Sequence, residues 1–280
     1  MTCSSSTRVA GCLAFICMAL PAVALGQGVT VMNRTVFAVP PSAVAGSGVV
    51  QSVPETASFE IAQHGHTVVT ASYQFAPTPS GYNSTALVKI AMQGLDYALS
   101  KTEQLSMANE LEHVQVSAAV NGEAVSAVAS PDSAQFLLNI SANGKSTTTR
   151  LTKHSATVFL ADFDPGALET LLNLAANHNN RGLWVILPLK TGSIEPVQLA
   201  TYADQQGTLD SHPILVHHMV ATIAGGSTDL FSGPENQLLQ AELPQEGFAL
   251  IRKGFVLTPP ARPIVPPNGQ GQGTPPPSGH

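Results

Sequence analysis

The stretch "VQVSAAVNGEAVSAVAS", Val114–Ser130, decides the fold, because small apolar residues alternate with polar ones on both sides of its central Asn121-Gly122 pair. Alternation of this kind is typical of a strand with one buried face. A two-residue type I′ turn needs positive φ at both central positions, which asparagine and glycine tolerate. The stretch therefore predicts a β-hairpin that turns at Asn121-Gly122.

The next stretch, "AQFLLNISANGKSTTTRLTK", residues 134–153, repeats this pattern around Asn143-Gly144, with a threonine-rich return strand. Two hairpins in succession favour an antiparallel meander over roughly residues 113–153.

After the hairpins, the period of the sequence changes to that of a helix. In "DPGALETLLNLAANHNN", which starts at Asp164, apolar residues recur at helical spacing at Leu168, Leu171, Leu172 and Ala175. Asp164 can cap the first turn, and Pro165 suits the first helical position, where no N–H donor is needed. Apolar, β-branched runs at 155–163 and 181–189 flank the helix. The segment predicts a strand-helix-strand unit with a locally parallel strand pair.

The segment from Ser84 to His113 fits two patterns. Its apolar residues follow a helical stripe, but Val88, Ile90 and Met92 also alternate as in a strand. We favour a helix over its second half, where Ser100 and Glu103 have the spacing of a capping box. Further strands are predicted at 57–63, 66–75, 214–224 and 247–257. The predicted fold class is α+β and β-rich: antiparallel hairpins in a meander, then the strand-helix-strand unit, then a disordered proline-rich C-terminal tail.

Residues 1–26 have the features of a secretory signal peptide. Arg8 supplies the positive charge, the run "VAGCLAFICMAL" supplies the apolar core, and small residues allow cleavage after Ala24 or Gly26. The apolar core is too short to span a membrane, and no later stretch reaches the roughly 18 apolar residues that a membrane helix needs. We expect an exported protein, periplasmic or extracellular, with no membrane span in the mature chain.

All three cysteines, Cys3, Cys12 and Cys17, lie within this signal, so we expect a mature chain without disulfides or thiolate sites. The net charge is −6, and removal of Arg8 with the signal would take it to −7. This acidic balance gives no electrostatic footprint for nucleic acid, which we exclude as a partner. Charged residues make up 11% of the chain, which is low for a globular protein and typical of exported β-rich proteins.

The globular region is expected at residues 27–258, as one domain or as two with a boundary near residue 153. Residues 259–280 form a tail, more than half proline and glycine, that has too few large apolar residues to fold. The tail is either a passive segment or a spacer or groove ligand.

The stretch "IAQHGHTVV", Ile61–Val69, holds His64 and His66, and an H-x-H pair on a strand can direct two imidazoles at one Zn or Cu ion. Such a site needs a third ligand. The candidates are His113, Asp162, Asp164, His212, His217 and His218, of which we choose His218. Gly65 equally suits a turn in which both rings are solvated.

The neighbouring histidines His217 and His218 point to opposite faces of their predicted strand, so at least one ring should be partly buried. A buried imidazole that is hydrogen-bonded within the protein is more common than a metal ligand.

These observations favour an exported, non-catalytic structural or binding protein of the cell envelope or extracellular space. Its partner would be a protein or an envelope polymer, and the chain gives no motif that fixes a cofactor. Two other classes stay open: a metal-binding protein or metal-dependent hydrolase that uses His64 and His66, and a metal-free hydrolase. The second would need a deep pocket with a serine or glutamate beside a histidine.

Overall fold

The computed structural model describes residues 55–63, 65–188, 192–244 and 247–259. These residues form 17 strands and one helix, so this part of the chain is mostly β-sheet. The predicted signal peptide at 1–26 lies outside the described residues, and so does the predicted tail from residue 260 onward.

The first eight strands form an antiparallel meander in which each strand pairs with the next. The predicted turn at Asn121-Gly122 is confirmed, with φ of 50° and 85°, and so is the turn at Asn143-Gly144. The meander begins well before the predicted residue 113. Its strands are β1 (Glu55–Gln63), β2 (His66–Thr78), β3 (Gly81–Met92), β4 (Leu95–Ser106), β5 (Leu111–Val120), β6 (Glu123–Asp132), β7 (Gln135–Ala142) and β8 (Lys145–Thr152).

The prediction of a helix in the second half of Ser84–His113 is wrong, because this segment forms β3, β4 and the start of β5. The spacing of Ser100 and Glu103 is not a capping box, since both lie within β4. Tyr97, Leu99, Lys101, Glu103 and Leu105 alternate on the buried face of that strand. Lys101 and Glu103 occupy buried positions where a strand normally has apolar residues. Their charge therefore interrupts the alternation of apolar and polar residues by which a strand is recognised.

The described residues after β8 form one helix and nine further strands. They are β9 (Ala156–Phe159), α1 (Pro165–Asn177), β10 (Leu183–Leu187), β11 (Ser193–Thr201), β12 (Gln205–Leu209), β13 (His212–Ile223), β14 (Gly226–Ser232), β15 (Leu238–Leu243), β16 (Phe248–Arg252) and β17 (Phe255–Leu257). β9 and β10 pair in parallel, and the other strand pairs are antiparallel. The single strand predicted at 247–257 is two strands, because the chain turns at Gly254, which takes a φ of 84°. β16 pairs with β1 and β15, whereas β17 pairs with β12.

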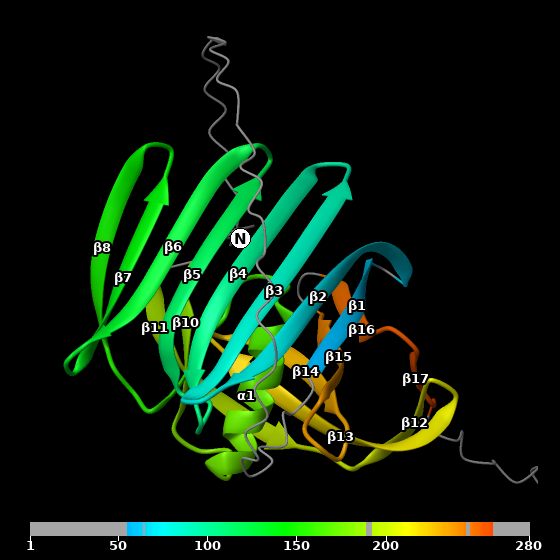
Figure 1. Cartoon of the computed structure of the whole chain (residues 1–280). Coiled ribbons are helices and arrows are strands. Elements are labelled where there is room, and N and C mark those ends of the chain that lie inside the picture. Colours follow the sequence, from blue (N-terminus) through cyan, green and yellow to red (C-terminus); the bar gives the residue numbers. More distant parts are fainter. Residues whose placement is uncertain (1–54, 64, 189–191, 245–246, 260–280) are drawn as a thin grey trace, which may run out of the picture. The chain divides into compact units, whose positions relative to one another are not determined.

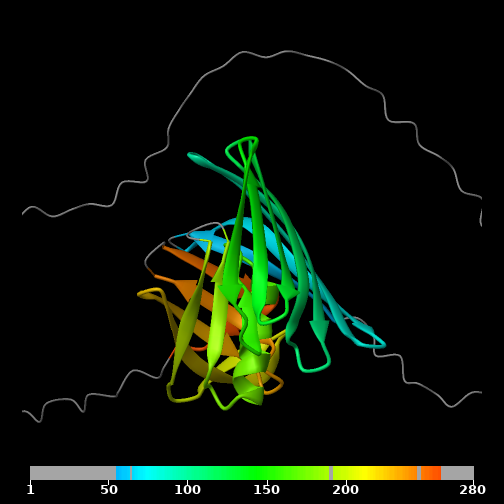
Figure 2. The same cartoon turned by 90° about the vertical axis from the view of Figure 1, so that its left-hand side faces the viewer.

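One mixed sheet joins both halves of the described chain, because β16 pairs with β1. The sheet therefore runs from β8 through the meander to β1, and on through β16, β15, β14, β13, β11 and β10 to β9. β12 pairs with β13 and with β17, beside this order. Figures 1 and 2 show α1 between the meander strands and the strands of the second half, so the sheet bends around the helix.

Helix α1 is the centre of the hydrophobic core. Asp164 caps it by accepting the Ala167 N–H at 3.1 Å, and Pro165 stands in the first turn, as predicted. Leu168, Leu171, Leu172 and Leu174 are all buried, and the helix contacts β2, β3, β9, β10 and β15. A helix that is buried on nearly all sides needs such enclosure. No described helix has the length and apolar character needed to span a membrane.

Two polar contacts fix the helix within this core. At its start, the Lys101 Nζ lies 2.7 Å from Asp164 Oδ2 and 3.0 Å from Glu103 Oε2, and all three side chains are buried. Burial lowers the pKa of Lys101, but the carboxyl groups of Asp164 and Glu103 outweigh burial and hold that pKa above its ordinary value. Burial raises the pKa of Glu103, which favours its neutral form. Lys101 is therefore held between two carboxyl groups, of which Asp164 is the nearer.

The second contact is made by Glu169, which is buried in the middle of α1. Its Oε2 accepts hydrogen bonds from the Tyr73 hydroxyl of β2 and from the Leu238 N–H of β15, the latter at 2.8 Å. Arg252 lies farther away, with Nη1 4.0 Å from the same oxygen. Burial is the main cause that raises the pKa of Glu169 to about 7.

We predict that replacement of Glu169 by glutamine removes part of the pH dependence of stability. The folded protein keeps a proton on Glu169 that the unfolded chain releases between pH 4.5 and about 7. The free energy of unfolding should therefore fall as pH rises through this window, by about 3 kcal/mol at 1.4 kcal/mol per pKa unit. Urea denaturation at pH 4.5 and pH 8 measures this fall in the free energy of unfolding. The fall should be smaller in Glu169→Gln than in wild type by this amount.

The glutamine carbonyl can still accept both hydrogen bonds, so the variant should keep the fold. Glu60→Gln, on the exposed face of β1, is the matched control and should retain the wild-type pH dependence. Equal pH dependence in wild type and Glu169→Gln would show that Glu169 is ionised in the folded protein.

Candidate functional site

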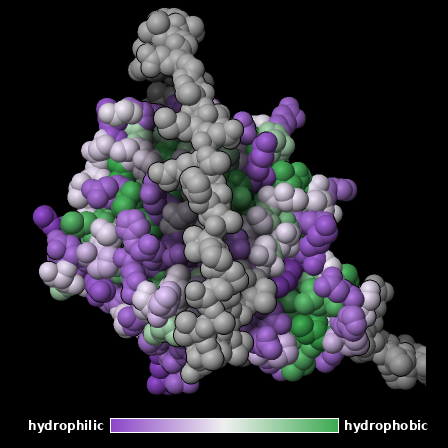
Figure 3. Space-filling view, viewed as in Figure 1, coloured by the Kyte–Doolittle hydropathy of each residue, from purple (hydrophilic) through white to green (hydrophobic). Residues whose placement is uncertain are grey.

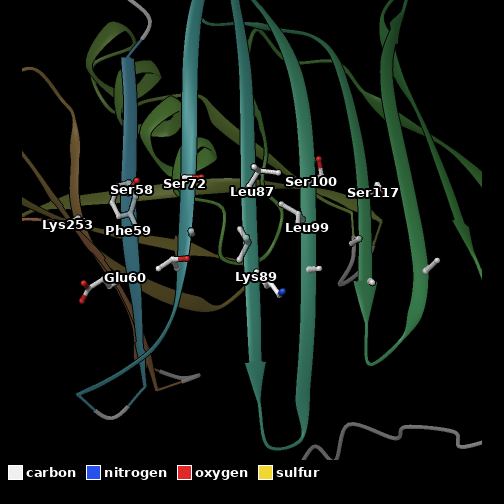
Figure 4. Close-up of a pocket in the computed structure, with 17 residues that line it drawn as sticks. Ser58, Phe59, Glu60, Ser72, Leu87, Lys89, Leu99, Ser100, Ser117 and Lys253 are labelled. Atoms are coloured by element: carbon white, nitrogen blue, oxygen red, sulfur yellow. The ribbon is translucent and has the colours of Figure 1, made fainter. Parts of the chain in front are cut away.

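A groove of about 790 Å³ lies on the face of the meander that points away from α1. Figure 4 shows its side chains on this outer face, with the helix on the far side of the sheet. It crosses β1 to β6 rather than following one strand. Figure 3, which views the same side of the molecule, shows hydrophilic and hydrophobic residues interspersed over the meander.

The groove follows a row of serines that lie directly opposite one another on neighbouring strands. The row consists of Ser58, Ser72, Leu87, Ser100, Ser117, Ser126, Ser141 and Ser146, one residue from each strand from β1 to β8. Leu87 is its one residue that is not serine. We call these eight residues the serine row. Neighbouring strands are about 4.8 Å apart, so the row presents hydroxyl groups at a regular interval across the sheet.

Adjacent hydroxyl groups of the serine row can come within hydrogen-bond distance of each other. At its far end, the Oγ atoms of Ser141 and Ser146 are 2.5 Å apart. The first five residues of the row, Ser58 to Ser117, line the groove, and the last three continue the row beyond it.

A parallel row forms the other side of the groove. It consists of Glu60, Thr70, Lys89, Ala98, Ala119 and Ala124, again one residue from each strand. The charged groups Glu60 and Lys89 lie toward β1, where Lys253 also lines the groove. The β4 to β6 side presents methyl groups. The groove therefore has one polar, partly charged end and one uncharged end.

The local sequence explains why the groove exists. Large side chains such as Phe59, Val88 and Leu99 alternate onto the buried face, and small side chains occupy the exposed positions between them. Small residues leave the outer face hollow. Leu87 is 58% exposed in the middle of this face, where it forms an apolar spot among hydroxyl groups.

The groove offers hydrogen bonds, apolar contact and, at its β1 end, charged groups. Hydroxyl groups both donate and accept, whereas the alanine methyl groups and Leu87 give apolar surface. None of the described residues that line it is a histidine or a cysteine. Glu60 already accepts a hydrogen bond from the Thr67 hydroxyl at 3.1 Å. This chemistry supports binding of an uncharged polar molecule.

A smaller cavity of about 210 Å³ lies between the β9–α1 connection and the β13–β14 hairpin. It contains Asp162 and Asp164, both candidates for a third metal ligand. The Asp164 carboxyl group contacts Lys101 and the Ala167 N–H, which gives it a structural role. The other residues that line this smaller cavity are mostly apolar.

The predicted metal ligands are distributed over different strands. His64 lies outside the described residues, and His66 is exposed at the start of β2. His218 lies on β13, and the sheet order places β1, β16, β15 and β14 between these two strands. Among the described residues, no three His, Cys, Asp or Glu side chains form a group that could hold a metal ion. The site at His64, His66 and His218 stays a prediction, because His64 is not described.

His218 is the partly buried imidazole that the sequence predicts on this strand. Its side chain is 15% exposed, and the ring stacks between Phe231 and Tyr202. Its Nε2 lies 2.8 Å from Asp229 Oδ1. His217, on the other face, contacts Asp204 at 2.9 Å. His218 therefore has protein partners on the ring faces and at Nε2.

Sequence reasoning missed the serine row, although two of its pairs could have been found. Ser117 and Ser126 are equally distant from the Asn121-Gly122 turn, and Ser141 and Ser146 are equally distant from Asn143-Gly144. A two-residue turn fixes the register, so these pairs must lie opposite each other. The rest of the row depends on turns that no Asn-Gly pair marks and on the segment 84–113, which fits both a helix and a strand in sequence.

Comparison with known proteins finds no matching protein-family model, no similar curated protein and no similar solved structure.

Proposed function

We propose that this chain is an exported, non-catalytic binding protein of the cell envelope or extracellular space that holds a polysaccharide in the groove of the meander. The observation that carries the proposal is the serine row, which lines a groove that crosses several strands. A groove of this extent fits an elongated molecule better than a compact one.

The chemistry of the groove favours a polysaccharide over other polymers. Sugar rings present hydroxyl groups at their edges and C–H groups on their faces, which complement serine hydroxyls and alanine methyl groups. The strand spacing of about 4.8 Å is similar to the length of one sugar unit, so successive units can meet successive strands. A nucleic acid would need a strongly basic surface, and the chain has a net charge of −6.

The affinity of such a groove should come from many weak contacts. A hydrogen bond contributes roughly 0.5–1.5 kcal/mol net, and the described lining has no aromatic side chain that points outward for a sugar to stack on. Binding should therefore strengthen with polymer length, and an insoluble polymer is the appropriate first probe.

We predict that the purified chain co-sediments with at least one of cellulose, chitin or peptidoglycan. The double variant Ser100→Ala, Ser117→Ala should bind that polymer about tenfold more weakly, because two lost hydrogen bonds correspond to about 1.4 kcal/mol or more. Depletion isotherms give both dissociation constants. Thr85→Ala, Thr102→Ala is the matched control, because these threonines lie opposite each other one row away on the same face.

The dissociation constant of the control variant should lie within about twofold of the wild-type value, and we count a difference of this size as no change. The proposal fails if none of the three polymers retains the protein, or if both double variants bind as well as wild type. Retention on immobilised polypeptides instead would assign the groove to a protein partner.

Export to the periplasm is the location that the sequence supports best. Residues 1–26 combine Arg8, an apolar run and small residues near Ala24, and they contain every cysteine of the chain. The described body needs no disulfide, because α1 and the sheet enclose a continuous hydrophobic core.

We predict that the full chain, expressed in a Gram-negative bacterial host, is released by osmotic shock with Leu25 or Gln27 as its first residue. Phe15→Arg places a charge in the apolar run and should keep the uncut chain in the cytosol. N-terminal sequencing of both products checks this. A wild-type product that starts at Met1 and stays in the cytosol contradicts export.

A further inference from the structure

Lys101, Glu103 and Asp164 form a dry cluster between β4 and the start of α1. All three are at most 2% exposed. Nζ of Lys101 lies 2.7 Å from Asp164 Oδ2, so its distance to the carboxyl carbon, Cγ, is at most about 4 Å given a carbon–oxygen bond of about 1.23 Å. The same nitrogen lies 3.0 Å from Glu103 Oε2.

We propose that Lys101 and Asp164 react with each other to form an intramolecular isopeptide bond, with Glu103 as the group that moves the proton. The structure shows the two side chains in contact before the reaction. The product is an amide between Nζ of Lys101 and Cγ of Asp164, and it joins the middle of β4 to the residue that caps α1.

The surroundings favour the amide over the ion pair. Two buried charges are costly to keep away from water, whereas an amide is neutral. The enclosed core also excludes the water that would reverse the reaction. Since the cluster holds amine and carboxyl group in contact, the reaction is unimolecular and needs no external reagent.

The helix supplies a site for the charge that develops during attack. When Nζ adds to Cγ, negative charge grows on the carboxyl oxygens of Asp164. Its Oδ1 already accepts the Ala167 N–H at 3.1 Å, and it faces the positive end of α1. A backbone donor fixed in this position stabilises an oxyanion.

Glu103 is placed to carry the second proton. Its Oε2 contacts the Lys101 Nζ, and its Oε1 has no hydrogen-bond partner among the described residues. Burial raises the pKa of Glu103, which favours the protonated form that can pass a proton on.

The atoms balance without a co-reactant. The Lys101 ammonium gives one proton to Asp164 Oδ2 and becomes a free amine. Nζ then forms a bond to Cγ, and its next proton passes through Glu103 to Oδ2. The bond between Cγ and Oδ2 breaks, one water leaves, and Glu103 returns to its starting state. No atom is oxidised or reduced.

The bond would link the sheet covalently to the helix that it encloses, in a chain whose described residues include no cysteine. It would thereby serve the same end as a disulfide, by a cross-link between residues far apart in sequence. The inference is independent of the ligand that the groove binds.

Intact-mass spectrometry of the purified full chain under denaturing conditions tests the proposal. The measured mass of wild type should be one water below the mass calculated from its sequence after signal cleavage. Proteolysis should yield a branched peptide that joins Lys101 to Asp164. Lys101→Arg keeps the charge but should show the full mass. Glu103→Gln should be cross-linked at least tenfold more slowly, and Lys145→Arg, at an exposed lysine on β8 outside the groove, should react as wild type does.

Dilute acid gives a second readout. Asp164-Pro165 is the one Asp-Pro bond in the sequence, and acid cleaves such bonds with the help of the free aspartate carboxyl group. Wild type should therefore resist cleavage between residues 164 and 165, whereas Lys101→Arg should be cut. This readout works on denatured protein, so it needs no folded variant once wild type has been shown to fold by circular dichroism.

Folded wild type with the mass of the unlinked chain overturns the proposal. A loss of water that maps to residues other than Lys101 and Asp164 overturns it as well. Glu103→Gln that reacts as fast as wild type overturns the assignment of the proton transfer to Glu103.

Discussion

The contact between Lys101 and Asp164 is the constraint on which the rest of the described structure depends. It holds the start of α1 against the buried face of β4, and the Glu169 contacts then tie the same helix to β2 and β15. A helix that is buried on all sides must be enclosed, so the sheet has to bend around it. Removal of one partner of such a buried pair costs roughly 3–5 kcal/mol, because the other charge is left alone.

This arrangement divides the meander into two faces with different tasks. The face toward α1 carries the large apolar side chains and both polar contacts, so it is committed to stability. The outer face carries small hydroxyl and methyl side chains and has no part in the core. Substitutions in the groove should therefore leave the fold intact, as is usual for surface positions on a rigid scaffold.

Local features could be predicted from the sequence, and features that join distant residues could not. The turns at Asn121-Gly122 and Asn143-Gly144 and the start of α1 at Pro165 follow from local chemistry. β4 was missed because Lys101 stands at a buried position, and its partner Asp164 is 63 residues away. The full serine row needs the register of seven successive strand pairs. It becomes visible only when all eight strands are in place.

The central claim is that the outer face of the meander is the binding surface. Thiol footprinting tests this claim most directly. The mature chain is expected to lack cysteine, so Ser100→Cys and Val256→Cys each introduce a single thiol, one in the groove and one at an exposed position on β17. A polysaccharide that retains the protein should slow alkylation at residue 100 severalfold and leave residue 256 unchanged. Equal alkylation rates at residue 100 with and without that polysaccharide would contradict the account.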